Sequence, residues 1–120
     1  MHSLRILILF VGSALNVQSL SAACSKEQPA FAELIASKYN SVSSPLNVAE
    51  IEKENMIEIR ETKEVLAFGY ANKQWLQFKA AIEPGDKVYF MAHTKNKFYL
   101  DGHILVRKGC VVQFLKGAIS

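Results

Sequence analysis

The sequence predicts an α+β fold: an antiparallel sheet of about five strands with one to three helices packed on one face. In the first half of the chain, apolar side chains recur at spacings of three and four, which is typical of amphipathic helices. In the second half, apolar and polar side chains alternate over short segments, which is typical of half-buried strands. Short turns between those segments favour antiparallel pairing of neighbouring strands.

Residues 1–23 have the layout of a secretory signal peptide. Arg5 precedes the apolar stretch 6–17, and small residues follow it up to Cys24. The stretch is shorter than the roughly 20 apolar residues that a membrane-spanning helix needs. We therefore expect residues 24–120 to form a single small domain that is exported, with the bacterial periplasm as its compartment.

The cysteines Cys24 and Cys110 are expected to form a disulfide, because an exported chain with two cysteines allows a single pairing. Closing a loop of about 87 residues would stabilise the fold by about 4 kcal/mol in the chain-entropy model. The alternative is a lipid anchor on Cys24. Lipoprotein signals usually have Leu three residues before the cysteine, where this chain has Ser21, and Leu20 lies one position earlier.

Two helices are expected near the start of this domain. In segment 29–39, Phe31 and Leu34 belong to a face with apolar spacings of three and four. A polar break at 40–44 separates this helix from a second, shorter one at 45–55.

The next segments predict a hairpin and one ambiguous element. Alternation at 56–60 and the apolar run at 65–70, with a polar connection between them, indicate two paired strands. In segment 72–82, Trp75 and Phe78 share a helical face, but the same segment also alternates as a strand would. Its length and alanine content favour a helix.

The C-terminal part predicts three strands. A turn at 84–86 precedes a strand at 87–93, and strands at 103–107 and 110–115 flank the turn 108–109. A tight turn with Gly between two apolar strands is a strong hairpin signal.

This part of the chain resembles a group of small, exported, uncharacterised bacterial proteins. The shared features are the Pro84-Gly85-Asp86 turn before a strand and the hairpin GHILVRKGCVV at 102–112, which is similar to the pattern GYxLVRxGxVV. The resemblance covers roughly the last 45 residues. Phe98 stands near where the group has Trp, and Cys110 takes a polar position. The resemblance implies an extracytoplasmic bacterial setting and names no site.

Composition argues against several classes of function. The formal net charge is +3, of which residues 1–23 supply Arg5, so the domain is too close to neutral for a dedicated nucleic-acid binder. His93 and His103 lie outside any metal-ligand spacing, and the chain has no catalytic motif. We therefore expect no cofactor, no metal and no nucleic-acid partner.

Aromatic and cationic residues alternate near the C-terminal strands. Such a surface can bind an anionic polymer or an acidic patch of an envelope protein. The alternative is that these are ordinary half-buried sheet residues with solvated lysines around them. The candidate binding residues, around an expected loop at 94–102, are Lys95, Lys97, Phe98, Tyr99, Arg107 and Lys108.

The sequence thus favours a small exported binding or accessory protein that is not an enzyme. A small extracytoplasmic hydrolase using His103 and Asp101 is an alternative, although no nucleophile accompanies the pair. A structural component tethered to the envelope through a lipid on Cys24 is another.

Overall fold

A computed structural model describes residues 24–120, so the predicted signal peptide lies outside the described residues. In this part of the chain a four-stranded antiparallel sheet has the order β1-β4-β5-β6, and β2 and β3 form a separate two-stranded hairpin. The strands are β1 (Asn40–Val42), β2 (Met56–Glu58), β3 (Val65–Ala67), β4 (Lys87–Lys95), β5 (Phe98–Arg107) and β6 (Cys110–Ile119).

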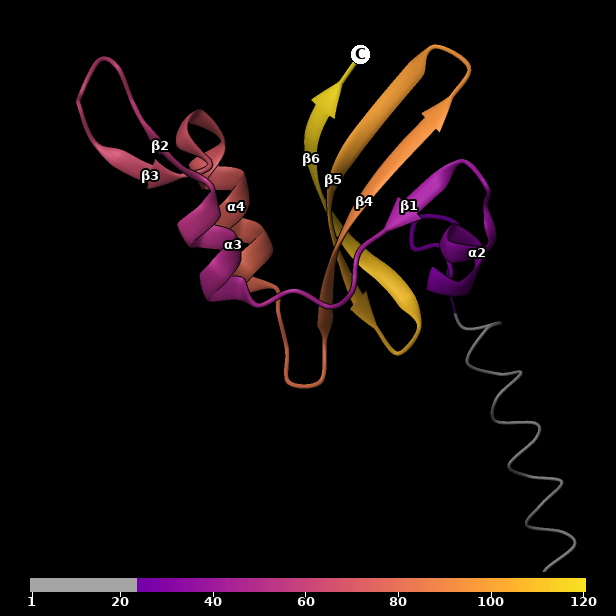
Figure 1. Ribbon diagram of the computed structural model, residues 1–120. Helices are drawn as coiled ribbons and strands as arrows, with labels where there is room; N and C mark the ends of the chain where they lie inside the picture. Colours follow the sequence, from indigo (N-terminus) through magenta and orange to yellow (C-terminus); the bar gives the residue numbers. More distant parts are fainter. Residues whose placement is uncertain (1–23) are drawn as a thin grey trace, which may run out of the picture.

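The helices cover both faces of the four-stranded sheet. They are α2 (Phe31–Ala36), α3 (Val48–Glu54), a short 3-10 helix η1 (Gly69–Ala71) and α4 (Asn72–Ala80). The α+β class is confirmed, but the expected single layer of helices is not found: α3 and α4 lie on one side of the sheet and α2 on the other (Figure 1). The strands expected to form one sheet of about five are likewise divided between the sheet and the β2–β3 hairpin.

The larger core lies between the sheet and helices α3 and α4. Leu105 of β5 and Trp75 of α4 are both 0% exposed, and Phe78 stacks on Trp75 with ring centroids 5.8 Å apart. Trp75 Nε1 also donates a hydrogen bond of 2.8 Å to Glu52 Oε2 of α3, which satisfies the indole N–H at the edge of the core. The helix prediction for 72–82 is confirmed, because the apolar spacing faces a sheet that buries it.

The smaller core lies under α2. Side chains alternate along a strand, so Ile104 faces away from the core that contains Leu105. Phe31 stacks on Tyr89 of β4 at 4.4 Å, and Leu34 packs against the same cluster. Because α2 has only six residues, it covers only part of this face.

Helix α2 is shorter than the expected helix at 29–39. Ser37 adopts extended dihedral angles (φ −72°, ψ 127°), and the chain then enters β1 within the expected polar break. Asn40 Nδ2 donates to the Leu34 carbonyl oxygen at 2.9 Å, which satisfies one of the acceptors left free at the helix end. Tertiary pairing with β4 makes this segment a strand, and three residues are too few to reveal alternation.

Of the two long hairpins, β5–β6 has the turn that the sequence predicts, whereas the strands of β4–β5 are longer than predicted. Lys108 and Gly109 both have positive φ (51° and 80°), so the tight turn between β5 and β6 is confirmed. The expected loop at 94–102 is instead strand: β4 and β5 stay paired up to Lys95 and Phe98. Only Asn96 and Lys97 form the turn, with Asn96 at φ 57°.

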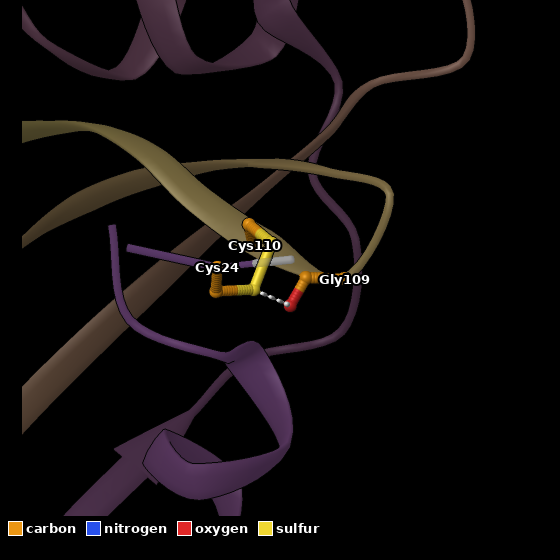
Figure 2. Close-up of a disulfide and its surroundings, with 3 residues drawn as sticks. All are labelled: Cys24, Gly109 and Cys110. Atoms are coloured by element: carbon orange, nitrogen blue, oxygen red, sulfur yellow. Dashed lines mark hydrogen bonds between the residues drawn. A yellow bond between two sulfur atoms is a disulfide. The ribbon is translucent and has the colours of Figure 1, made fainter. Parts of the chain in front are cut away.

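The predicted disulfide between Cys24 and Cys110 is present, with a Cα–Cα distance of 5.5 Å (Figure 2). Cys24 Sγ lies 3.8 Å from the carbonyl oxygen of Gly109 in the adjacent turn. Phe31 N donates to the same oxygen at 2.8 Å, and Val111 N donates to Pro29 O at 2.8 Å. The N-terminal segment is therefore fixed along the start of edge strand β6. The disulfide occupies the Cys24 sulfur to which the lipid of the alternative prediction would be attached.

Candidate binding surface at the open end of the sheet

The structure places the candidate binding residues in three separate regions: the β4–β5 turn, the far end of β5 and, for Tyr99, the opposite face of the sheet. Lys95 and Phe98 pair across the β4–β5 turn, with Lys97 in the turn itself. Arg107 and Lys108 lie at the other end of β5, about 30 Å away for a strand of this length. The predicted set therefore does not form one surface.

Tyr99 belongs to the opposite face of the sheet from Phe98, since neighbouring residues of a strand alternate. Its hydroxyl donates to Asp101 Oδ2 at 2.6 Å, and this carboxylate raises the pKa of Tyr99. Asp101 Oδ1 accepts from Ala118 N of β6 at 2.8 Å. Tyr99 thus helps to hold the end of β6 and is not next to Phe98 in space.

Arg107 is engaged within the fold. Its Nε and Nη2 donate to Asp86 at 3.0 and 2.8 Å, and Nη2 also donates to the carbonyl oxygen of Ala81 at 2.8 Å. The hydrogen bonds from Arg107 lower the pKa of Asp86, although burial opposes this. Arg107 is therefore better described as a structural residue than as a ligand-binding one.

Around Lys95 and Phe98 the structure gathers residues that the sequence did not single out. The ammonium groups of Lys38 and Lys95 lie 5.4 and 5.1 Å from the centre of the Tyr39 ring. The His93 ring lies between the rings of Tyr39 and Phe98, with centroid distances of 6.2 and 6.1 Å. We call these five residues the hairpin cluster.

The hairpin cluster could not be found from sequence spacing. Lys38 and Tyr39 precede β1, whereas His93, Lys95 and Phe98 belong to the β4–β5 hairpin more than fifty positions later. The register Asn40↔His93 between β1 and β4 brings the two segments together. Because this register joins distant parts of the chain, no local pattern reports it.

A short hydrogen-bond chain orients the His93 ring. Asn40 donates through Nδ2 to Leu34 O, so its Oδ1 is the acceptor that faces His93 Nδ1 at 2.7 Å. Nδ1 therefore carries a proton. Within residues 24–120 no hydrogen bond engages Nε2, which is left to interact with a ligand.

The hairpin cluster borders a groove beside α2. A cavity of about 510 Å³ adjoins His93 and Phe98, and a second of about 250 Å³ continues from it toward Val111. Both cavities are lined by Leu34, Met91 and Leu100, so they form one continuous feature, which we call the α2-face groove.

Phe114 of β6 forms the far wall of the groove. A Cβ added to Gly102 would lie 2.9 Å from two atoms of the Phe114 ring, so the absence of a side chain there lets the ring lie against β5. The groove is thus bounded by α2 on one side and by an aromatic ring on the other, with Met91 and Ile104 between them.

The alternative acid–base pair, His103 and Asp101, lies on the other face. His103 is 8% exposed and has the rings of Phe68 and Phe90 edge-on to it at 5.6 and 5.2 Å. Burial lowers the pKa of His103, and the charge of Asp101 opposes this in part. Between residues 24 and 120 no hydrogen bond joins the two side chains; Asp101 instead binds Tyr99 and Ala118. This geometry does not favour a base held by an orienting acid.

Two further observations concern only the described part of the chain. No three His, Cys, Asp or Glu side chains in residues 24–120 lie close enough together to hold a metal ion. None of the helices described above combines the length and the apolar character that crossing a membrane requires.

The chain was also compared with known proteins, and the resemblance of its C-terminal part to small exported bacterial proteins stays a prediction. No protein-family model, curated protein or solved structure matches the chain.

Proposed function

We propose that the protein is an exported bacterial binding protein, not an enzyme, that takes an anionic molecule of the cell envelope at the hairpin cluster. The observation that carries this proposal is the placement of two lysines, Lys38 and Lys95, against one aromatic ring, Tyr39.

Two like charges near one ring are an arrangement that an anion would stabilise. Each ammonium gains from the Tyr39 ring, but the two cations repel each other, and Lys97 in the adjacent turn adds a third positive charge. A bound anion would reduce this repulsion. The aromatic faces of Tyr39 and Phe98 would contact the apolar part of such a ligand; these residues are 37% and 46% exposed.

The disulfide supports the export part of the proposal. Bonds of this kind form and persist in oxidising compartments such as the bacterial periplasm. Cys24 is also the first residue after the segment that resembles a signal peptide.

A pair of charge-matched variants tests the proposal. Lys38→Gln with Lys95→Gln removes two cations from the hairpin cluster, and Lys53→Gln with Lys73→Gln removes two from exposed positions on α3 and α4. The protein would be purified in its disulfide-bonded form after export, and its binding to envelope extract and to polyphosphate measured at rising salt.

We expect the first variant to lose most of the binding and the second to keep it, with binding by the wild type weakening as salt screens the charges. Equal binding by the two variants would show that net charge, and not the hairpin cluster, determines capture.

A further inference from the structure

We propose that the α2-face groove binds the acyl chain of a long-chain carboxylate, with the carboxylate at the His93 and Lys95 end. The proposal rests on the proposed function and names the class of ligand that the site would take. Its basis is the juxtaposition of an apolar groove with an oriented imidazole and a set of cations at one of its ends.

The dimensions and lining of the groove fit a single chain. The larger of its two cavities, of about 510 Å³, is of the size at which proteins bind small molecules, and the smaller adds about 250 Å³. From Phe98 to Ile104 the lining follows β5 over six positions, or about 20 Å. Its central part is lined by the apolar side chains of Leu34, Met91 and Ile104, and the polar lining residues lie toward its two ends.

The charges at the two ends give the ligand a direction. Lys38, Lys95 and Lys97 lie around the His93 end, whereas Glu27 lines the opposite end. A carboxylate is therefore favoured at the first end and disfavoured at the second. Glu33 on α2 lines the first cavity and opposes this preference, so its removal should strengthen binding of a carboxylate.

His93 supplies a directed hydrogen bond for the head group. Because Asn40 Oδ1 engages Nδ1 at 2.7 Å, Nε2 is the ring nitrogen that can form a hydrogen bond with the head group. Polar side chains that line this end, Ser37 and Asn40, add to the same head-group region.

An acyl chain fits the groove better than an extended peptide does. Edge strand β6 lines the far end of the groove, at residues 111–114. The central floor is formed by β4 and β5, which are inner strands in the order β1-β4-β5-β6, so their backbone groups are already paired within the sheet. A peptide laid there would leave its own N–H and C=O groups without partners, which is costly, whereas a hydrocarbon chain has no such groups.

The test measures binding of three probes to the disulfide-bonded exported protein, below the concentration at which they form micelles. The probes are palmitate, the uncharged alcohol of the same chain length, and butyrate. We expect palmitate to bind tightest, the alcohol to bind more weakly because it lacks the charge, and butyrate to bind weakest because it leaves the groove empty.

Variants test whether palmitate binds in the groove and at which end its carboxylate lies. Leu100→Asn should weaken palmitate binding about tenfold, whereas Leu76→Asn, at a 51% exposed position on α4, should leave it unchanged. His93→Phe should weaken binding of palmitate more than binding of the alcohol, and Glu33→Gln should strengthen palmitate binding. Each variant is first compared with wild type by thermal unfolding, so that only folded proteins are scored.

Two results would overturn the inference. One is equal affinity for palmitate and butyrate; the other is an unchanged affinity of folded Leu100→Asn protein for palmitate. If either occurs while polyphosphate still binds through Lys38 and Lys95, the proposed function stands and only the acyl ligand is refuted. Preference for an extended apolar peptide over palmitate would likewise refute the acyl ligand.

Discussion

Arg107 and Asp86 form a two-point ion pair between the end of β5 and the turn before β4. Nε and Nη2 of the guanidinium donate to the two carboxylate oxygens at 3.0 and 2.8 Å, and the Asp86 side chain is 2% exposed. Nη2 also donates to Ala81 O at the end of α4. One side chain therefore fixes a helix end, a turn and a strand, and the Pro84-Gly85-Asp86 motif is explained by this structural role.

Replacing Arg107 should destabilise the protein strongly. Arg107→Ala leaves the Asp86 carboxylate, whose side chain is 2% exposed, without its partner, and we expect a clear loss in the free energy of unfolding. Lys87→Ala, at an exposed position on β4, is the control and should change it by less than about 0.5 kcal/mol. Urea unfolding measures both. Equal stability of the two variants would mean that the ion pair contributes only as much as a surface pair.

His103 should make the protein less stable in mild acid. Burial lowers its pKa in the folded state below the unfolded value, which is about 6.5. The unfolded chain then binds more protons at acidic pH, so the stabilisation is full above about pH 6.5 and declines as the pH falls toward the folded-state pKa.

The variant His103→Phe tests this pH dependence. It removes the titrating group but keeps an aromatic ring between Phe68 and Phe90. The free energy of unfolding should then fall less between pH 7 and pH 5 than it does in the wild type. An identical decline in the two proteins would assign the acid sensitivity to other groups.

Removing the disulfide should lower stability by about 4 kcal/mol, because the bond spans a separation of 86 residues and so restricts the unfolded chain. The double change Cys24→Ser with Cys110→Ser avoids a free thiol. Urea unfolding of this variant gives the loss, and reduced wild-type protein should behave in the same way. Intact mass after alkylation without reductant checks the bond itself, since two alkylated thiols would contradict it.

Phe78 should be essential for the larger core. Phe78→Ala removes a ring that is 3% exposed and stacks on Trp75, so we expect a loss of about 3–5 kcal/mol. Leu76→Ala, on the exposed side of the same helix, is the matched control and should cost far less. Thermal unfolding compares the two. A Phe78→Ala protein that melts at the wild-type temperature would place the core elsewhere.

Local patterns determined much of the fold. The β2–β3 hairpin and the tight turn at 108–109 follow from spacing and turn residues over a few positions. At 72–82 the spacing allowed a helix or a strand, and length and alanine content favoured the helix that the structure contains. The disulfide followed from a count of two cysteines, which leaves one pairing. The helix, the hairpin and the turn each depend on residues within one short segment, and the disulfide depends on there being one possible pair of cysteines.

Tertiary structure alone decided the candidate site. Whether Tyr99 joins Phe98 depends on the face that each occupies, and the longer β4–β5 pairing puts them on opposite faces. In the sequence, Arg107 cannot be distinguished from a surface cation. Only the fold brings Asp86, 21 positions away, into contact with it. The hairpin cluster exists because β1 pairs with β4. That register joins segments more than fifty positions apart, and no segment of the sequence contains it by itself.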